Sequence, residues 1–206
     1  MAPTFETGPT LAGELKKALE SSEAERKKEN EKSKSDPLTG YLLFDKNKDG
    51  IQKLIDDMNF SNDVRRHKTG AVMVVFCDLN DFKPINDKYG HPVGDDALRV
   101  FADRLAKAET RTTESVYRKG GDEFILVLPI DNDQEITDSL LEKIMNDLRG
   151  RVNNDFNFDA EGDIIPMSAS MGYSVIRKGE QKSLDELVSE ADQGMYQDKK
   201  SSGKGR

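Results

Sequence analysis

Apolar residues recur every three or four positions along three segments of the chain, residues 48–66, 95–108 and 134–152. This spacing places apolar side chains on one face of a helix, so it predicts three amphipathic helices. A further helix is predicted after Ser183, because Ser183 and Glu186 have the separation of a capping box.

Between the first two of these helices the pattern predicts a strand, a short helix and a turn. Residues 70–78 are apolar throughout, which is typical of a central strand buried on both faces. Residues 81–89 are predicted to form a short helix, and residues 90–92, which contain Gly and Pro, are predicted to form a turn.

Two β-hairpins are predicted further along the chain. The strands of the first lie around residues 116–117 and 124–128, and the second spans residues 156–176. The order of elements is therefore β-α-β-β-α-β with an inserted hairpin. This order predicts an α+β fold with an antiparallel-containing sheet and helices packed on one face.

The N-terminal segment has a different composition from the rest of the chain. Residues 10–34 are rich in Glu, Lys and Ala and contain no Pro, which favours a helix. The apolar face of this helix ends at Leu19, so a solvated helical lead is the plainer interpretation, and a dimer-forming or signal-transmitting stalk is the alternative. Pro37 excludes Asp36 from the helical region and ends the segment. We therefore expect a helical lead over residues 1–35 and one domain over residues 36–206.

Composition narrows the classes of partner. The chain has 206 residues, enough for one well-buried domain plus an appendage, and its formal net charge is −8. This charge argues against a nucleic-acid surface, which needs clustered Lys and Arg. With no long apolar run and no signal-peptide pattern, we expect a cytoplasmic protein without a membrane partner. Cys77 lies within an apolar strand pattern and is expected to be a small buried hydrophobe.

Candidate chemistry gathers at the first hairpin. Gly120, Gly121, Asp122 and Glu123 follow one another at its turn. An ordinary solvated turn would use the same residue types. However, the predicted strand over residues 70–78 also ends on a carboxylate, and carboxylates at two neighbouring strand ends make a site for a hard divalent cation. Because the chain is acidic, a phosphate-bearing substrate is expected to bring a metal.

A second acidic stretch has a plainer explanation. Residues 45–50 read Asp-Lys-Asn-Lys-Asp-Gly, like the start of a calcium-binding EF-hand loop. The twelfth position of such a loop would be Asp56, whereas a bidentate Glu is required there. The predicted amphipathic helix is the better account of this region.

Several motifs in the same order resemble those of the GGDEF family of diguanylate cyclases. They are Asp-Pro-Leu-Thr-Gly at 36–40, Phe-Lys-Pro-Ile-Asn-Asp at 82–87, Gly-His-Pro-Val-Gly-Asp at 90–95, Gly-Gly-Asp-Glu-Phe at 120–124, Ser-Met-Gly at 170–172 and Ala-Asp at 191–192. The resemblance runs from Asp36 almost to the C-terminus. It implies a nucleotidyl-cyclase-like fold with a ferredoxin-like β-α-β-β-α-β core, flanking helices and an added hairpin.

The resemblance also implies an activity. Two GTP molecules condense to cyclic di-GMP and two pyrophosphates, with one GTP held by each domain of a head-to-tail homodimer. Asp78, Asp122, Glu123 and the backbone carbonyl of Leu79 are the implied ligands of magnesium, or of manganese in its place. Asp122 and Glu123 are the implied catalytic residues. Asp122 is a candidate general base, although a metal-bound hydroxyl could serve equally well.

For the substrate, the chemistry of guanine favours particular residues. Asp95 can accept hydrogen bonds from the ring N–H and amino group of guanine, and Asn86 can form hydrogen bonds with the remaining edge of the base. Asp95 could also be a helix N-cap, and the two roles can coexist. The complete set of implied substrate contacts is Phe82, Lys83, Asn86, Asp95, Gly120, Gly121, Lys199 and Lys204.

The chain departs from the family pattern at two places. The family's inhibitory product site is an Arg-x-x-Asp motif, and here it reads Arg111-Thr-Thr-Glu114. The longer acid predicts weak product inhibition, carried mainly by Arg111. Near the C-terminus the family's Lys-x-x-Gly-Arg becomes a sequence with an extra residue and a final Lys204, which leaves open which of Lys199 and Lys204 binds phosphate.

Two other functions fit the resemblance. One is a non-catalytic module that binds GTP or cyclic di-GMP and signals through contacts; the intact Gly-Gly-Asp-Glu-Phe motif argues against it. The other is a cyclase that accepts ATP in part, and the acidic Asp95 argues against that.

Overall fold

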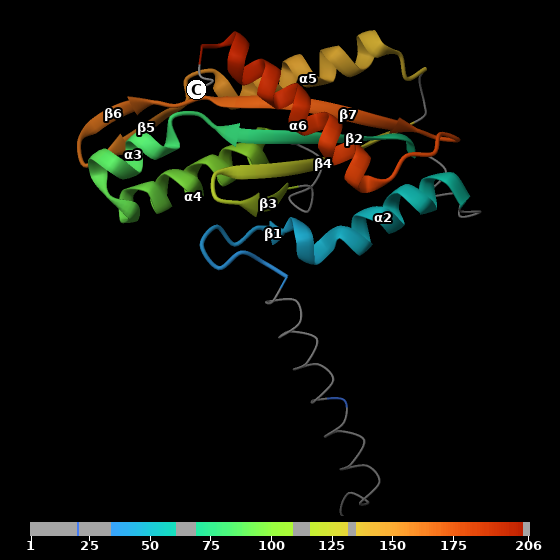
Figure 1. Ribbon diagram of the computed structural model, residues 1–206, viewed down its shortest axis with the longest axis horizontal. Helices are drawn as coiled ribbons and strands as arrows, with labels where there is room; N and C mark the ends of the chain where they lie inside the picture. The colour runs from blue at the N-terminus through green and yellow to red at the C-terminus, as the bar shows by residue number, and fades with distance from the viewer. Residues whose placement is uncertain (1–19, 21–33, 61–68, 109–115, 132–134, 204–206) are drawn as a thin grey trace, which may run out of the picture. The chain divides into compact units, whose positions relative to one another are not determined.

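The computed structural model describes residues 20, 34–60, 69–108, 116–131 and 135–203 (Figure 1). By its internal contacts the chain divides into two units, Met1–Ser35 and Asp36–Arg206. Apart from Glu20, Lys34 and Ser35, the described residues belong to the second unit. The predicted helical lead therefore lies almost entirely outside the described residues.

The second unit is built around a five-stranded mixed sheet. Its elements, in order, are β1 (Leu42–Leu43), α2 (Phe44–Phe60), β2 (Thr69–Leu79), α3 (Phe82–Tyr89), α4 (His91–Ala108), β3 (Val116–Gly120), β4 (Glu123–Asp131), α5 (Asp138–Asn153), β5 (Asn157–Ala160), β6 (Asp163–Pro166), β7 (Ala169–Arg177) and α6 (Leu184–Ser201). The strand order is β1-β3-β4-β2-β7. Among the strand pairings of this sheet in the described residues, that of β1 with β3 is parallel and the other three are antiparallel. The order β3-β4-β2-β7 is that of a ferredoxin-like core, so the predicted α+β class is confirmed.

Strand β2 is the centre of the sheet and is buried on both faces, as its apolar run predicted. Ala71, Met73 and Val75 face one hydrophobic cluster, while Val72 and Val74 face the other. Successive side chains of a strand point to opposite faces, so a two-sided apolar strand requires a cover on both sides.

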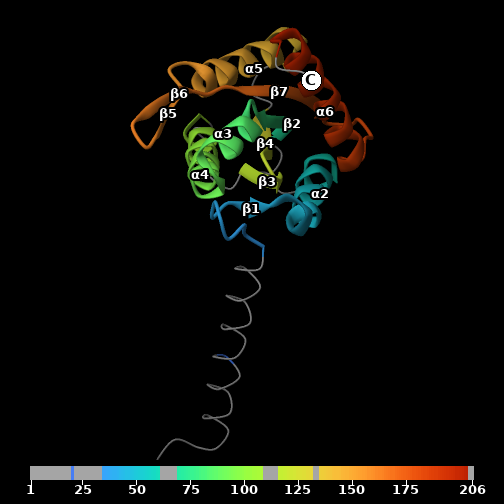
Figure 2. The same ribbon diagram turned by 60° about the vertical axis from the view of Figure 1, so that its left-hand side comes forward.

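Helices supply that cover on both faces, which corrects the expectation that they pack on one. Helices α3, α4 and α5 contribute to the first cluster, and α2 and α6 contribute to the second. Figure 2 shows α4 on one side of the sheet and α2 and α6 on the other. The prediction was correct for the two core helices α4 and α5. It was wrong for α2 and α6, because the order of elements alone does not specify the face that a terminal helix covers.

The start of α4 also differs from the prediction. Residues 90–92 were expected to be a turn, but the helix already begins at His91. Proline is tolerated in the first turn of a helix, where backbone N–H groups have no partner in the helix. The amide of Gly94 donates to the carbonyl of Gly90 at 3.2 Å. Asp95 therefore lies in the second turn of α4, and its interpretation as an N-cap was wrong.

Other boundaries also differ from the prediction. Helix α2 begins at Phe44, so the sequence over residues 45–50 is helical and is not a calcium-binding loop. Helix α5 begins at Asp138, because the side chain of Thr137 caps it by accepting a hydrogen bond from Leu140 N. The second hairpin consists of β5 and β6 alone, and β7 is instead a long strand of the main sheet.

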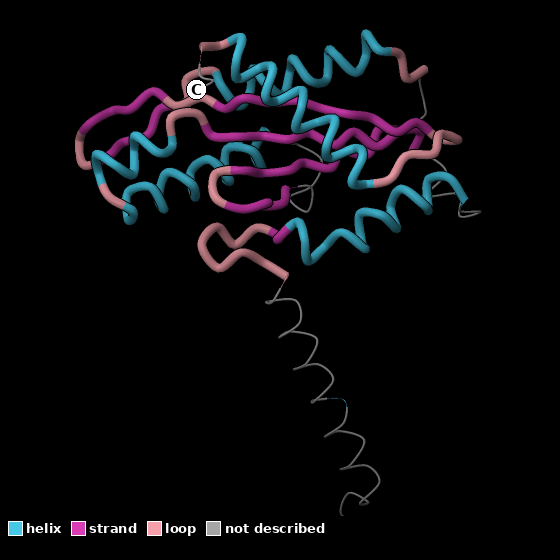
Figure 3. The backbone as a smooth tube through the Cα atoms, in the orientation of Figure 1, coloured by secondary structure: helices cyan, strands magenta, loops and turns pink. Residues whose placement is uncertain are grey.

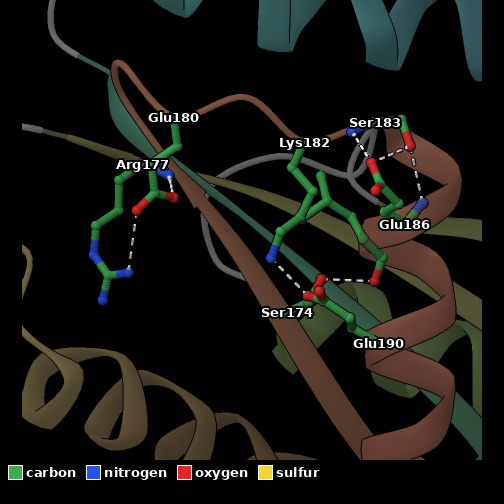
Figure 4. Close-up of polar contacts among 8 residues, drawn as sticks. Ser174, Arg177, Glu180, Lys182, Ser183, Glu186 and Glu190 are labelled. Carbon is green, nitrogen blue, oxygen red and sulfur yellow. Dashed lines mark hydrogen bonds and ion pairs between the residues drawn. The ribbon is translucent and has the colours of Figure 1, made fainter.

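The connection from β7 into α6 is fixed by polar contacts (Figure 4). The Ser183 hydroxyl accepts from Glu186 N at 3.2 Å, and a Glu186 carboxylate oxygen accepts from Ser183 N at 2.8 Å, which confirms the predicted capping box. The buried Ser174 hydroxyl donates to the carbonyl of Leu187 at 2.6 Å. These bonds fix where α6 begins and tie its first turns to β7.

Two glycines allow α6 to lie directly on β7. A Cβ atom at Gly172 would be 2.0 Å from Met195 N, and one at Gly194 would be 3.3 Å from the Cα atom of Gly172. Further along α6, the Asp198 carboxylate accepts from Met171 N at 2.8 Å. The helix is therefore held against β7 from its start to its last turn.

Among the helices in the described residues, none combines the length and apolar composition needed to cross a bilayer.

Candidate active site

Two strand ends meet where the sequence places its carboxylates. In the register of β2 and β4, Asp78 lies opposite Glu123, and Leu79 N donates to the carbonyl of Asp122 at 3.2 Å. Figure 3 shows the turn between β3 and β4 at the same end of the sheet as the loop that follows β2. The antiparallel pairing therefore brings the carboxylates of two sequence motifs to one edge.

The turn that carries Asp122 depends on glycine. Gly120 pairs with Glu123 across the hairpin, so Gly121 and Asp122 form its two-residue tip. Gly121 has φ +53°, in the left-handed region that side chains with a Cβ atom rarely adopt. The glycine lets the chain reverse within two residues, and Asp122 projects from the tip.

The end of β2 is held on its other side by a buried polar cluster. Asn80 Oδ1 accepts from the Ser170 hydroxyl at 2.8 Å, and Asn80 Nδ2 donates to the Ser168 hydroxyl at 3.0 Å. Asn80 and Ser170 are buried. Buried polar groups that are satisfied in this way rigidify their surroundings, so the position of Asp78 is fixed from both neighbouring strands.

A cavity of about 570 Å³ opens at this edge, and we call it the acidic cavity. Its lining residues come from the end of β2, from α3 and the residue before it, from the hairpin tip and from α6. They are Asp78, Leu79, Asp81, Phe82, Lys83, Pro84, Asp122, Glu123, Asp192, Met195, Tyr196 and Lys199.

The acidic cavity unites seven of the residues singled out from the sequence. These are Asp78, Leu79, Phe82, Lys83, Asp122, Glu123 and Lys199. Gly120, Gly121, Asn86 and Asp95 are not among its lining residues. Arg111, Glu114 and Lys204 lie outside the described residues.

Asn86 and Asp95 are brought near each other at the start of α4. A Cβ atom at Gly94 would be 1.9 Å from Asn86 Oδ1, so the Asn86 side chain lies directly against Gly94. Asp95 is the next residue along α4. Gly94 thus leaves room for the Asn86 amide next to the backbone of α4, one residue before Asp95.

Crowding of carboxylates shapes the electrostatics of the acidic cavity. Burial raises the pKa of Asp78, against the effect of the Lys199 ammonium. Burial also raises the pKa of Glu123, and the negative charges of Asp78 and Asp122 add to the shift. A site that disfavours its own negative charges in this way is stabilised by a bound cation.

The donor set of the acidic cavity suits magnesium. Magnesium takes oxygen ligands, usually one or two carboxylates with waters and phosphates, and the carboxylates of Asp78, Asp122 and Glu123 suit it. Within the described residues, no group of three or more His, Cys, Asp and Glu side chains already has a metal-binding arrangement. Instead, Lys199 Nζ lies 2.5 Å from Asp78 Oδ1. The donor types fit the ion, while one of the donors is paired with a lysine.

Asp192 was not predicted as a site residue, although it lines the acidic cavity. Its negative charge contributes to raising the pKa values of both Asp78 and Glu123. Asp192, Met195, Tyr196 and Lys199 have the spacing of one helix face. That spacing was present in the sequence, but it identifies a face only after the partner of that face is known.

A second unpredicted feature joins residues 36–39 to the hairpin tip. Arg118 Nη1 pairs with Asp36 Oδ2 at 2.8 Å, and Arg118 Nη2 donates to the carbonyl of Gly121 at 2.7 Å. Asp36 Oδ2 also accepts from the amide and hydroxyl of Thr39, at 2.8 and 2.7 Å. Arg118 therefore connects the first residue of the second unit with the turn that carries Asp122.

This ion pair predicts a pH-dependent stability. Burial raises the pKa of Asp36, but the hydrogen bonds from Arg118 and Thr39 outweigh it, so the pKa lies below its ordinary value of 3.8. The carboxylate then stabilises the fold at pH values above 3.8, and this contribution is lost as the pH falls through the lowered pKa. We expect Asp36→Asn to cost roughly 2–4 kcal/mol of unfolding free energy at pH 7.

Urea denaturation of the two proteins at pH 7 and at pH 3 measures this effect. The difference in unfolding free energy is expected to shrink at the lower pH. Asp147→Asn, which removes an exposed carboxylate on α5, is the control and is expected to change little at either pH. An Asp36→Asn deficit that is equally large at pH 3 would contradict the assignment of the effect to this charge.

Comparison with known proteins agrees with the family that the motifs indicated. A family model described as diguanylate cyclase, GGDEF domain, matches residues 34–205. Diguanylate cyclase DgcZ of Escherichia coli K12 is 32% identical over 143 residues, which cover 69% of this chain and 45% of DgcZ. Response regulator PleD of Caulobacter vibrioides NA1000 is 35% identical over 141 residues, covering 67% of this chain and 30% of PleD. The chain thus spans less than half the length of these curated relatives.

Solved structures share the fold. The coiled coil and GGDEF domain of DgcB from Caulobacter crescentus, solved with c-di-GMP, has a TM-score of 0.66 at 20% identity and covers 94% of this chain and 96% of that one. A sensory box/GGDEF family protein from Caulobacter crescentus has a TM-score of 0.65 at 27% identity, over 82% of this chain and 99% of that one. The nucleotidyl-cyclase-like fold expected from the motifs is confirmed. With a family model matched over residues 34–205 and the same fold in these structures, the chain belongs to the GGDEF domain family.

Proposed function

We propose that this chain is a diguanylate cyclase that condenses two GTP molecules into cyclic di-GMP. In each half of the reaction, the ribose 3′-oxygen of one GTP bonds to the α-phosphorus of the other. The bond from that phosphorus to pyrophosphate breaks, and the hydroxyl proton passes to a base. The observation that carries the proposal is the convergence of Asp78, Asp122 and Glu123 on the acidic cavity. The retention of all three carboxylates argues against a non-catalytic module.

The carboxylates of the acidic cavity are proposed to hold magnesium, or manganese in its place. Asp78, Asp122, Glu123 and the carbonyl of Leu79 are the proposed ligands. A bound divalent cation would neutralise charge on the phosphates and favour loss of the hydroxyl proton. Of the side chains, Asp122 has the most suitable position for a general base, because it projects from the hairpin tip and lines the cavity.

Contacts are proposed both to the guanine base and to the triphosphate of the nucleotide. Asp95 and Asn86 are proposed to recognise guanine, and the close packing of Asn86 on Gly94 supports their acting together. Lys83 and Lys199 are proposed to bind the triphosphate, since both line the acidic cavity. Phe82, which also lines it, offers an apolar surface to the nucleotide. Gly120 and Gly121 would let the nucleotide approach the hairpin backbone.

The remaining sequence-based expectations stay proposals. Arg111 and Glu114 are proposed to form a weak inhibitory site for cyclic di-GMP. Lys204 is a second candidate for phosphate binding. Residues 1–35 are proposed to be a helical lead to the domain.

The direct test is product formation. The purified chain is incubated with GTP and magnesium, and cyclic di-GMP and pyrophosphate are measured by chromatography. We expect one cyclic di-GMP for every two pyrophosphates released. An absence of cyclic di-GMP with either magnesium or manganese, from a folded protein, would overturn the proposal.

Catalysis is expected to depend on protein concentration. One domain that holds one GTP cannot close a ring from two nucleotides, so two chains are proposed to meet head to tail. Specific activity should therefore fall as the protein is diluted through its dimer dissociation range. Initial rates over a hundredfold dilution series, with the association state followed by light scattering, measure this. A rate per chain that stays constant down to fully monomeric protein would contradict the dimer.

A further inference from the structure

An internal cation already occupies one of the carboxylates of the acidic cavity. Lys199 Nζ lies 2.5 Å from Asp78 Oδ1. The Asp78 side chain is only 10% exposed and that of Lys199 is 25% exposed. The Coulomb attraction within a pair this close and this sheltered from water is larger than that within a pair on the surface.

The position of Lys199 is built into the fold. It lies in the last turn of α6, which is held against β7 by Gly172 and by the bond from Met171 N to Asp198. Asp198 faces β7, and the next residue, Lys199, reaches the end of β2. Lys199 is thus delivered to Asp78 by an anchored helix.

Electrostatics explains why a cation is needed there. Asp78 shares its surroundings with the negative charges of Asp122 and Asp192, which disfavour its ionised form. Without a metal, the Lys199 ammonium offsets this repulsion. A divalent cation at Asp78 would offset the same repulsion, and two cations at one carboxylate repel each other.

We infer that Lys199 and the metal compete for Asp78, so that metal binding releases the Lys199 ammonium into the acidic cavity. The released ammonium then has a new partner only if an anionic group is present there. On the proposed function, on which this second step rests, that group is the triphosphate. Lys199 therefore weakens metal binding in the absence of nucleotide and couples the two binding events.

The first test needs no nucleotide. Mn²⁺ is titrated into the purified chain, and free Mn²⁺ is measured by electron paramagnetic resonance. Lys199→Met and Lys199→Gln are each expected to bind Mn²⁺ roughly tenfold more tightly than the unaltered chain, a size typical of coupling between sites. Adding Asp78→Asn to Lys199→Met is expected to abolish the gain, because the contested carboxylate is then neutral.

Lys200→Met is the matched control. It removes the same charge one residue away, but the Lys200 ammonium lies 4.3 Å from the centre of the Tyr196 ring. Its Mn²⁺ affinity is expected to change by less than about twofold, the effect of a surface charge. If Lys199→Met and Lys200→Met increased the Mn²⁺ affinity equally, the change in net charge would explain the increase, and the inference would be overturned. Unchanged or weaker Mn²⁺ binding by both Lys199 variants, including no binding at all, would also overturn it.

A second readout is thermal stability. Without metal, Lys199→Met leaves Asp78 unpaired and is expected to melt below the unaltered chain; saturating Mn²⁺ is expected to restore most of the loss. A melting deficit that Mn²⁺ leaves in place would mean that the metal does not take the place of the ammonium.

The coupling to nucleotide is tested with a GTP analogue whose bond between the α- and β-phosphates cannot be cleaved. The analogue is expected to tighten Mn²⁺ binding more in the unaltered chain than in Lys199→Met. An equal tightening in both would overturn the coupling. A chain that does not bind the analogue would count against the proposed function, whereas the competition at Asp78 is decided by the titrations without nucleotide.

Discussion

Substituting any one of three carboxylates is expected to reduce cyclic di-GMP formation by at least about a hundredfold, the scale of losing a metal ligand or general base. The variants are Asp78→Ala, Asp122→Ala and Glu123→Gln. All three residues line the acidic cavity, and their charges repel one another there. On the proposed function, their removal takes away cation binding or proton transfer, while the hydrophobic clusters on both faces of the sheet are expected to remain intact.

Product formation is measured by chromatography at saturating GTP and magnesium, and folding is checked by circular dichroism. Asp147→Asn on α5 is the matched control, since it removes an exposed carboxylate outside the cavity. It is expected to retain full activity. Normal turnover by any one of the three cavity variants would remove that residue from the proposed mechanism.

Gly172→Ala is expected to destabilise the domain strongly, because the added methyl group has no space. The new Cβ atom would be 2.0 Å from Met195 N and 2.3 Å from the carbonyl oxygen of Ala191. Both are backbone atoms of α6, so no side chain can rotate to make room. The helix would have to move away from β7, at a cost on the order of 3 kcal/mol or more.

The matched control is Gly50→Ala. Gly50 lies within α2, and a Cβ atom there would meet nothing within 4 Å. Alanine is a better helix former than glycine by about 1 kcal/mol, so this variant should be unchanged or slightly stabilised. Thermal denaturation of the two variants measures the contrast. If Gly172→Ala had the same melting temperature as the unaltered chain, the description of α6 as closely packed on β7 would be wrong.

Much of the end of the sheet that carries the carboxylates could be predicted from local sequence. Asp78 ends an apolar run, and Asp122 follows the glycine that makes the hairpin turn. Each was therefore placed at a strand end by its neighbours in sequence. The antiparallel register of β2 and β4 then brings the two ends together, which required only that the strands be neighbours.

Contacts that depend on distant packing could not be predicted. Asp192 is a charged position on a terminal helix, and such positions usually face water. Lys199 was expected to contact the substrate, but its pairing with Asp78 was not predicted. Both residues line the acidic cavity only because α6 covers the same face of the sheet as α2. The ion pair of Asp36 and Arg118 joins residues 82 positions apart, and no pattern along the chain marks them as partners. The start of α4 differs from the prediction because Pro92 fits the first turn of a helix as well as it fits a turn.

The central position of β2 also determines when the domain can fold during synthesis. β2 lies between β4 and β7, and its partner residues on β7 are more than 90 positions away at the site end, where Asp78 pairs with Ser170. A ribosome releases the chain from the N-terminus, so β2 emerges long before this partner. Until β7 and α6 emerge, one edge of β2 is unpaired, and the face of the sheet that α2 and α6 cover together lacks the part supplied by α6. Loop closure of this length is slow, and an apolar strand with an open edge is prone to aggregate meanwhile. The nascent chain therefore has most need of chaperone protection between the emergence of β2 and that of α6.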